Sequence, residues 1–215
     1  MIASIRPSPA GPSAAGPAVP ESLDDAHLIV RSLDDPELFA QLYHRHAAEL
    51  LRYVARRLGH ALADDVVGET FLIAFRRRTR YDRTRAKALP WLYGIAANLI
   101  SQHRRSELRA YRALARTGVD PVAQTSGSDA DAVEGKVTAQ ASAPAIAAAL
   151  RSLSEGDRHV LLLIAWADLS YDEVAEALRI PLGTVRSRLN RARRKMRAAL
   201  PELDPILTAE THHHG

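Results

Sequence analysis

The side chains of this sequence that most clearly indicate a function are two clusters of arginine, which are suited to binding a polyanion. Residues 76–119 hold twelve Lys or Arg against two acids, and residues 186–197 hold seven against none. The neighbouring segments 21–75 and 120–185 are net acidic. Two basic clusters divided by acidic stretches indicate two separate contacts rather than one diffuse patch. Most of these bases are Arg, whose planar fork suits phosphates and guanine edges.

The second cluster belongs to a predicted helix-turn-helix. Ser170 to Glu173 forms a capping box that opens a short helix, residues 179–183 break that helix, and a last helix begins at Thr184. A small polar residue followed by arginines near a helix N-terminus suits the reading of base edges in a major groove. We place Arg188 on the face opposite Val185 and Ala192, and Arg194 at phosphates. A solvated basic helix at a domain end is the alternative.

The first cluster predicts a contact of another kind. Arg76 to Arg85 reads as a loop, and the helix after it combines Trp91, Tyr93 and Asn98 with two further arginines. Rings interleaved with arginines and amides are the parts of a single-strand site, in which unstacked bases lie on aromatic side chains. Trp91 also fits the apolar stripe of this helix, so a role in the core stays open.

Other kinds of chemistry find little support. The chain has no cysteine, which excludes disulfides and thiolate metal sites. Asp65 and Glu69 share a helix face and could hold a divalent metal, but acids at a helix start are far commoner. No Walker loop, GxSxG or HExxH motif is present. We therefore expect no enzyme, no cofactor and no metal.

The elements that must position these clusters are helices. Apolar residues recur with the helical period in every ordered stretch, and no stretch alternates with period two. Expected helix starts are Ser22, Asp34, Asp64 with Asp65, Pro90 and Ser154. The sequence therefore predicts an all-α fold.

Composition divides the chain into two small helical domains joined by a flexible linker. The predicted parts are a disordered tail at 1–20, a first domain at 21–108, a linker at 109–143, a helix-turn-helix domain at 144–200 and a tail at 201–215. The longest apolar run, Val160 to Ala167, is too short to span a bilayer, and no signal-peptide core is present. We expect a cytoplasmic protein without membrane insertion.

The two domains resemble those of a known family. The stretches from Phe39 to His46, from Ala63 to Phe75 and from Pro90 to Asn98 are similar to domain two of bacterial sigma-70 family RNA polymerase sigma factors of the extracytoplasmic-function (ECF) group. The stretches Leu153 to Leu163, Leu169 to Leu178 and Gly183 to Ala192 are similar to domain four of the same group. Gly68, Gln102 and Arg179 depart from the family pattern.

The resemblance implies an ECF-type sigma factor that binds core RNA polymerase, directs it to specific promoters and helps to melt the upstream-ten element. It implies contact with the polymerase beta and beta-prime subunits and with duplex and single-stranded promoter DNA, and an anti-sigma factor as a possible partner. The implied polymerase-binding residues are Asp64, Asp65, Glu69, Phe71 and Phe75, on a helix that exposes one of the two rings. The implied upstream-ten contacts are Arg76, Arg77, Arg78, Arg80, Arg83, Trp91, Asn98, Arg104 and Arg105. The implied upstream-thirty-five contacts are Thr184, Arg186, Ser187, Arg188, Arg191 and Arg194.

Two other classes remain as alternatives. A stand-alone helix-turn-helix repressor or activator would bind a palindromic duplex as a dimer, which needs a self-complementary surface. No apolar helix face is spare for such a dimer, and the first cluster would be unexplained. An RNA-binding or nucleic-acid-processing enzyme would need a catalytic constellation that the sequence lacks.

Overall fold

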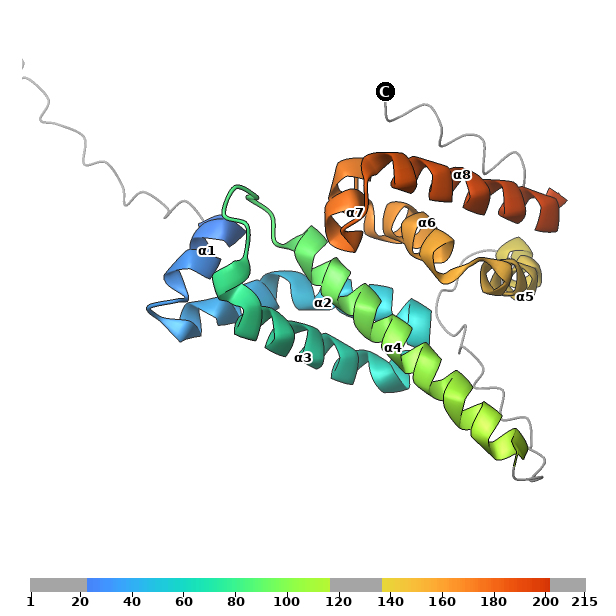
Figure 1. The fold of residues 1–215 in the computed structure, drawn as a ribbon, viewed down its shortest axis with the longest axis horizontal. Coiled ribbons are helices and arrows are strands. Elements are labelled where there is room, and N and C mark those ends of the chain that lie inside the picture. The colour runs from blue at the N-terminus through green and yellow to red at the C-terminus, as the bar shows by residue number, and fades with distance from the viewer. Residues whose placement is uncertain (1–22, 117–136, 202–215) are drawn as a thin grey trace, which may run out of the picture.

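The fold consists of two helical bundles that lie against each other (Figure 1). The computed structural model describes residues 23–116 and 137–201, and no strand occurs in these two ranges. The first bundle contains α1 (Asp25–Arg31), the 3-10 turn η1 (Pro36–Phe39), α2 (Ala40–Leu58), α3 (His60–Arg77), the 3-10 turn η2 (Arg78–Arg80) and α4 (Leu89–Arg116). The second contains α5 (Val137–Ser152), α6 (Glu155–Ala167), α7 (Tyr171–Leu178) and α8 (Leu182–Ala199). The all-α prediction is confirmed.

Local signals set most helix starts. The Ser154 side chain caps α6 by accepting from the Asp157 amide, and Ser170 with Glu173 forms the predicted capping box of α7. Asp35 caps η1, with Pro36 in its first turn. The predicted first cap was wrong: Asp24, not Ser22, caps α1 by accepting from the His27 amide, and Ser22 lies outside the described residues.

The start of α3 also differs from the prediction. The helix begins at His60, well before Asp64 and Asp65, which are exposed residues inside its second turn. Gly59, with φ of 84°, ends α2 and begins α3 without any intervening loop. Because this φ favours glycine, one residue is enough to form the corner between the two helices.

Helices extend into both ends of the predicted linker. The long helix α4 continues to Arg116 and α5 begins at Val137, so helix occupies both ends of the predicted segment 109–143. Residues 117–136, with the predicted tails 1–20 and most of 201–215, lie outside the described residues. The positions of the helices that carry the two arginine clusters are described in full.

The two bundles share a continuous apolar interior. Buried side chains of α2 and α4, among them Tyr53 and Leu92, form one cluster with Val160 and Leu163 of α6 and with Val174 of α7. In Figure 1, α4 lies on the side of the first bundle that faces the second, where α7 packs against it. No described helix is both long enough and apolar enough to cross a membrane.

Candidate nucleic-acid interface

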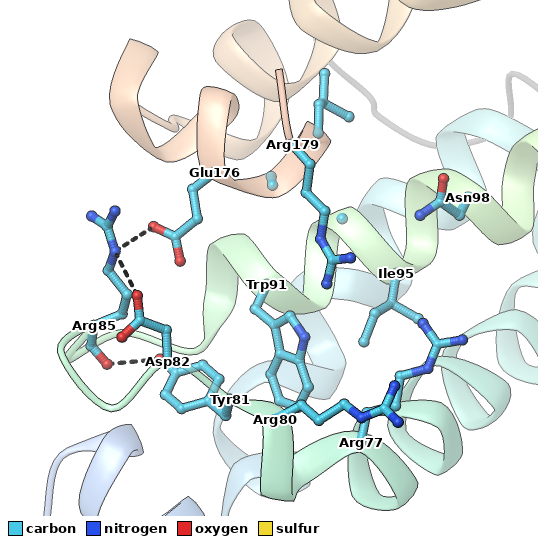
Figure 2. Close-up of a pocket in the computed structure, with 13 residues that line it drawn as sticks. Arg77, Arg80, Tyr81, Asp82, Arg85, Trp91, Ile95, Asn98, Glu176 and Arg179 are labelled. Carbon is cyan, nitrogen blue, oxygen red and sulfur yellow. Dashed lines mark hydrogen bonds and ion pairs between the residues drawn. The ribbon is translucent and has the colours of Figure 1, made fainter. Parts of the chain in front are cut away.

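A pocket of about 280 Å³ lies where the first arginine cluster meets α7 (Figure 2). Its walls come from the end of α3, the loop after η2, the first turns of α4 and the C-terminal end of α7. Four of the predicted single-strand contacts line it: Arg77, Arg80, Trp91 and Asn98. Tyr81, Arg85, Glu176 and Arg179 also line it and were not among the predicted site residues. Residues far apart in the sequence therefore meet in one concave site.

Trp91 serves the core and the pocket together. Its half-buried indole packs against the apolar cluster and also forms part of the pocket wall. The Tyr81 ring packs against the indole, with ring centroids 5.0 Å apart. The Tyr81 hydroxyl also donates to the carbonyl oxygens of Arg85 and Lys87, at 2.8 and 2.9 Å. Burial raises the pKa of this phenol, so it stays protonated. Tyr81 thereby fixes both the indole and the loop that follows it.

The pocket carries an excess of positive charge. Arg85 contacts Asp82 and Glu176, with its Nε 3.7 and 3.4 Å from their carboxylates. Among the described residues, no carboxylate pairs with Arg77, Arg80 or Arg179. Figure 2 shows Arg179 reaching from the end of α7 into the pocket. Unpaired guanidinium groups around a held indole suit a ligand that has both a planar ring and negative charge.

The other predicted single-strand residues divide into two groups. Arg76, Arg83 and Arg105 are exposed. Arg78 has a structural role, because its guanidinium donates to the carbonyl oxygens of Ser32 and Phe75. The guanidinium carbon also lies 3.8 Å from the centroid of the Phe75 ring. Arg104 donates to the carbonyl of Arg57 at 2.8 Å, and burial with nearby arginines lowers its pKa to about 10.

Tyr93, grouped with these residues by the sequence analysis, is fully buried and donates to Glu49 Oε1 at 3.1 Å. It belongs to the core, since a ring with no exposed face cannot stack on a base.

The predicted polymerase face of α3 has a different apolar residue from the one expected. Asp64, Asp65 and Glu69 are exposed, as the docking prediction requires. Phe71 is 6% exposed and packs against Tyr43, and Phe75 is half-buried between Phe39 and Arg78. The exposed apolar side chain is Leu72, at 47%, which the helical period places beside Asp65 and Glu69. Leu72 was not among the predicted residues, because the prediction considered only the two aromatic rings of this helix.

The helix-turn-helix consists of α7, a short turn and α8. Arg179 takes the left-handed conformation that ends α7, with φ of 52°. Glycine adopts this conformation more readily than arginine, so the turn is formed here by a residue that takes its backbone angles less easily. Val185, Leu189, Ala192 and Met196 are buried, and the bulk of the remaining α8 surface is basic. The motif itself is therefore as the sequence predicted.

The assignment of Arg188 to the outer face of α8 was wrong. It lies three residues after Val185, so the helical period places it beside the buried stripe rather than opposite it. It is half-buried, and its guanidinium contacts α6 so closely that a methyl group on Gly156 would lie 2.8 Å from Nη1. Arg191 donates to Asp157 Oδ1 at 3.0 Å, and Thr184 is half-buried. Arg191 is nevertheless exposed, and Arg186, Ser187, Asn190 and Arg194 are exposed as well; Asn190 was not predicted.

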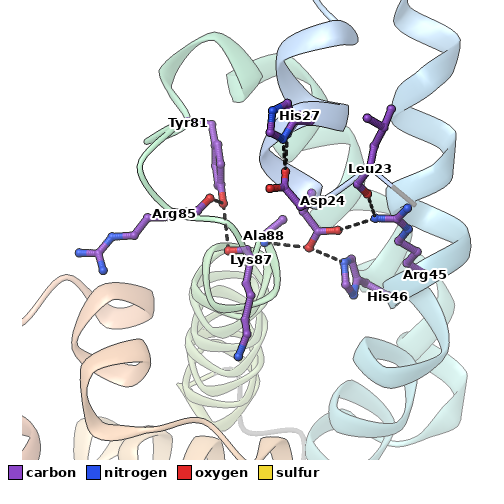
Figure 3. A network of polar contacts seen from close by, with 10 residues as sticks. Leu23, Asp24, His27, Arg45, His46, Tyr81, Arg85, Lys87 and Ala88 are labelled. Carbon is purple, nitrogen blue, oxygen red and sulfur yellow. Dashed lines mark hydrogen bonds and ion pairs between the residues drawn. The ribbon is translucent and has the colours of Figure 1, made fainter. Parts of the chain in front are cut away.

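A buried carboxylate connects α1 to the basic loop (Figure 3). Asp25 is 8% exposed and accepts from Arg45 Nη1 at 3.2 Å, His46 Nε2 at 2.8 Å and the Ala88 amide at 2.9 Å. Burial acts against the charge, but the bonds from His46, Ala88 and Arg45 outweigh it and lower the pKa of Asp25. Ala88 ends the loop that Tyr81 also holds. Asp25 therefore anchors one end of the loop that carries Arg83 and Arg85.

Comparisons with known proteins agree with these two units. Residues 42–114 match the family described as Sigma-70 region 2, and residues 144–196 match the one described as Sigma-70, region 4. The chain is 37% identical over 167 residues to the ECF RNA polymerase sigma factor SigL of Mycobacterium tuberculosis, covering 77% of this chain and 90% of that protein. It is 30% identical to the ECF RNA polymerase sigma factor SigW of Bacillus subtilis, covering 79% and 92%.

A solved structure has the same fold. The structure of CnrH in complex with the cytosolic domain of CnrY aligns with a TM-score of 0.56 and 26% identity, covering 83% of this chain and 97% of that one. A second, the sigma factor RpoE in complex with the anti-sigma factor NepR from Bartonella quintana, aligns with a TM-score of 0.57 at 23% identity.

Proposed function

The chain belongs to the ECF group of sigma-70 family sigma factors, and from this premise we propose how its residues divide the work of starting transcription. As a sigma factor it is a non-enzymatic initiation factor that binds core RNA polymerase and directs it to promoters. It acts in the cytoplasm, where the polymerase and promoter DNA are found. Like the sigma factor RpoE, which was solved in complex with the anti-sigma factor NepR, it would accept a protein partner of the anti-sigma class.

The pocket beside Trp91 is the single-strand site. The observation that carries this assignment is the indole, held by Tyr81 and surrounded by Arg77 and Arg80, which no described carboxylate neutralises. A base of the melted upstream-ten element would stack at the indole while its phosphates follow the guanidinium groups. Asn98 is exposed on the same helix and offers an amide to a base edge. The exposed Arg76, Arg83 and Arg105 would extend the path of the backbone, while Arg78 and Arg104 would position the elements rather than touch DNA.

The outer face of α8 is the duplex contact. Ser187 and Asn190 stand near the middle of the exposed face, with Arg186 beside them and Arg194 one turn further along. In a major groove, an amide suits adenine and a guanidinium suits guanine or phosphate. We assign the upstream-thirty-five element to these residues and a supporting role to Arg188 and Arg191, which contact α6.

The exposed face of α3 is the polymerase contact. Asp65, Glu69 and Leu72 form a small apolar spot with acids at its edge, the composition of a charge-guided protein interface. Phe71 and Phe75 support this face from beneath and would not touch the polymerase directly.

Run-off transcription with core polymerase tests the function. Promoter-specific transcript should require this protein, and Arg80→Ala or Asn98→Ala should impair promoter opening more than closed-complex formation. Permanganate reactivity of promoter thymines reports opening, and a pre-melted bubble template should rescue both variants. Specific duplex binding without polymerase, with no stimulated transcript, would instead identify a stand-alone repressor.

A further inference from the structure

The helix α7 packs on the face of α4 that carries the single-strand site. Gly94 lies between Trp91 and Asn98 on α4, and it is buried beneath the end of α7. A methyl group on Gly94 would collide with the carbonyl oxygen of Ala177 and lie 3.0 Å from its carbonyl carbon. The neighbour is backbone, which has no rotamer by which to move away. Only glycine permits so close an approach of the two helices.

Ion pairs extend this contact along the basic loop. Arg85 Nε lies 3.4 Å from Glu176 Oε2, and Lys87 Nζ lies 3.2 Å from Glu173 Oε1. Both acids belong to α7, and both bases belong to the first arginine cluster, next to Arg83 of the proposed DNA path. A carboxylate of α7 therefore stands where a phosphate would be expected. The side chains of Arg85 and Lys87 are 53% and 76% exposed, so these pairs are weak and sensitive to salt.

From this geometry we propose that the Gly94 face of α4 has two mutually exclusive partners, α7 of the same chain and single-stranded DNA, so that the helix-turn-helix unit shields the single-strand site until the two units separate. The inference rests on the proposed function, because it needs the pocket beside Trp91 to be the DNA site. The helix-turn-helix unit would then be an internal competitor for the strand, in addition to being a reader of duplex.

A second part of the contact between the units, where α2 meets α6, opposes closure. Arg57 of α2 is 5% exposed and packs near His159 and Ser101, with its Nη1 3.4 Å from His159 Nδ1. Its Nε and Nη2 atoms are buried without a hydrogen-bond partner among the described residues. A buried cation without an acid is costly, and separation of the units would return it to water. Burial of apolar side chains favours the form in which the two units are in contact, and the buried charge of Arg57 opposes it. The free-energy difference between the closed and the open form is therefore reduced.

A single methyl group provides the test. Gly94→Ala should force α7 away from α4 while leaving each bundle intact, because Ala raises helix propensity and the three atoms nearest to the added methyl group all belong to Ala177. Gly68→Ala is the matched control, since Gly68 lies exposed within α3 with no atom close to the added methyl. The chain has no native cysteine, so Glu37→Cys and Ala198→Cys give a single pair of spin labels on exposed residues of the two units.

Pulsed electron paramagnetic resonance would measure the label separation, and a fluorescent single-stranded oligonucleotide would measure binding to the full chain. The Gly94→Ala protein should show longer, broader distances than Gly68→Ala at unchanged helix content by circular dichroism. If a tenth of unmodified molecules are open, full opening should strengthen oligonucleotide binding about tenfold. Glu176→Gln, which removes one ion pair without crowding, should change both readouts in the same direction by less.

Equal distances in the Gly94→Ala and Gly68→Ala proteins would overturn the proposal. Opening without any gain in oligonucleotide binding would also overturn it, because α7 would then shield something else. Adding Arg80→Ala to the opened protein separates this failure from that of the proposed function. A loss of binding shows that the pocket is the single-strand site, whereas no loss shows that the site itself was assigned wrongly.

Discussion

At the scale of single residues, the angle of each side chain around its helix decides which arginines can reach DNA. Arg188 and Asn190 are two residues apart on α8, yet Arg188 contacts α6 beside Gly156 while Asn190 is exposed. Both types could read a base in isolation. Only the second has an open path to a groove, so residue type alone was a poor guide here.

We therefore expect Asn190→Ala to relax base preference at one or two positions of the upstream-thirty-five element, at a cost of about 1–3 kcal/mol in binding. Arg194→Ala should weaken binding evenly across sequences and lower the salt slope by about one, because it reaches only phosphate. A library of randomised upstream elements, bound at two salt concentrations, separates these effects. Arg188→Ala serves as the comparison and should leave the base preference unchanged. A changed base preference in this variant would show that Arg188 does contact a base.

Asp25 shows a positioning effect at the same scale. Asp25→Asn keeps the shape of the side chain but removes the charge that accepts from Arg45, His46 and the Ala88 amide. Disrupting such a buried network should lower the free energy of unfolding by about 3–5 kcal/mol. It should also loosen the loop before α4. Thermal unfolding measures the first effect, and permanganate reactivity on native and pre-melted templates measures the second. Equal opening by variant and parent at a temperature where both are folded would show that Asp25 only stabilises the fold.

At the scale of elements, signals confined to one turn of helix were readable from the sequence. The caps at Ser154 and Ser170 depend on partners three residues away, and both occur as predicted. The start of α3 was wrong because it depends on the backbone angle of Gly59. The Asp25 network and the contact between Gly94 and Ala177 join residues 20 to 83 positions apart, which no local pattern records. Arg77, Arg80, Trp91 and Asn98 of the candidate site were therefore predictable, while the loop residues Tyr81 and Arg85 and the contribution of α7 were not.

The exposed face of α3 provides the prediction for this scale. Asp65→Lys with Glu69→Lys, or Leu72→Glu alone, should weaken binding to core polymerase while helix content stays constant. The effect should exceed that of an ordinary rim charge, because the acids and Leu72 lie on one face. Fluorescence anisotropy of labelled protein titrated with core polymerase measures the change. Glu37→Lys, an exposed acid on η1, is the control for net charge. Affinity equal to that of the control would remove α3 from the polymerase interface.

At the scale of the whole molecule, contact between the two helical units depends on a histidine that must stay neutral. His159 of α6 is buried between the units, where its Nε2 lies 3.0 Å from Ser101 Oγ. Burial, followed by the charges of Arg57, Arg104, Arg158 and Arg188, lowers the pKa of His159 to about 3. Glu155 is the nearby acid, with its Oε1 3.8 Å from Nε2, and it also lies 4.0 Å from Arg105. Separation of the units would remove Arg57, Arg104 and Ser101 and return the imidazole towards its usual pKa of about 6.5.

Acid should consequently open the molecule. Between the low pKa of the closed form and about 6.5, the open form binds more protons, so closure is favoured above this window and is lost as the pH falls through it. The ratio of open to closed molecules should rise by up to about tenfold for each pH unit below 6.5. Spin-label distances between residues 37 and 198, recorded from pH 7.5 to 5.5, measure the shift. His159→Asn keeps an acceptor for Arg57 and a donor for Ser101 but cannot take up a proton, so its distances should stay constant over this range. A parent protein that is as insensitive to pH as His159→Asn would show that His159 stays buried when the rest of the contact opens.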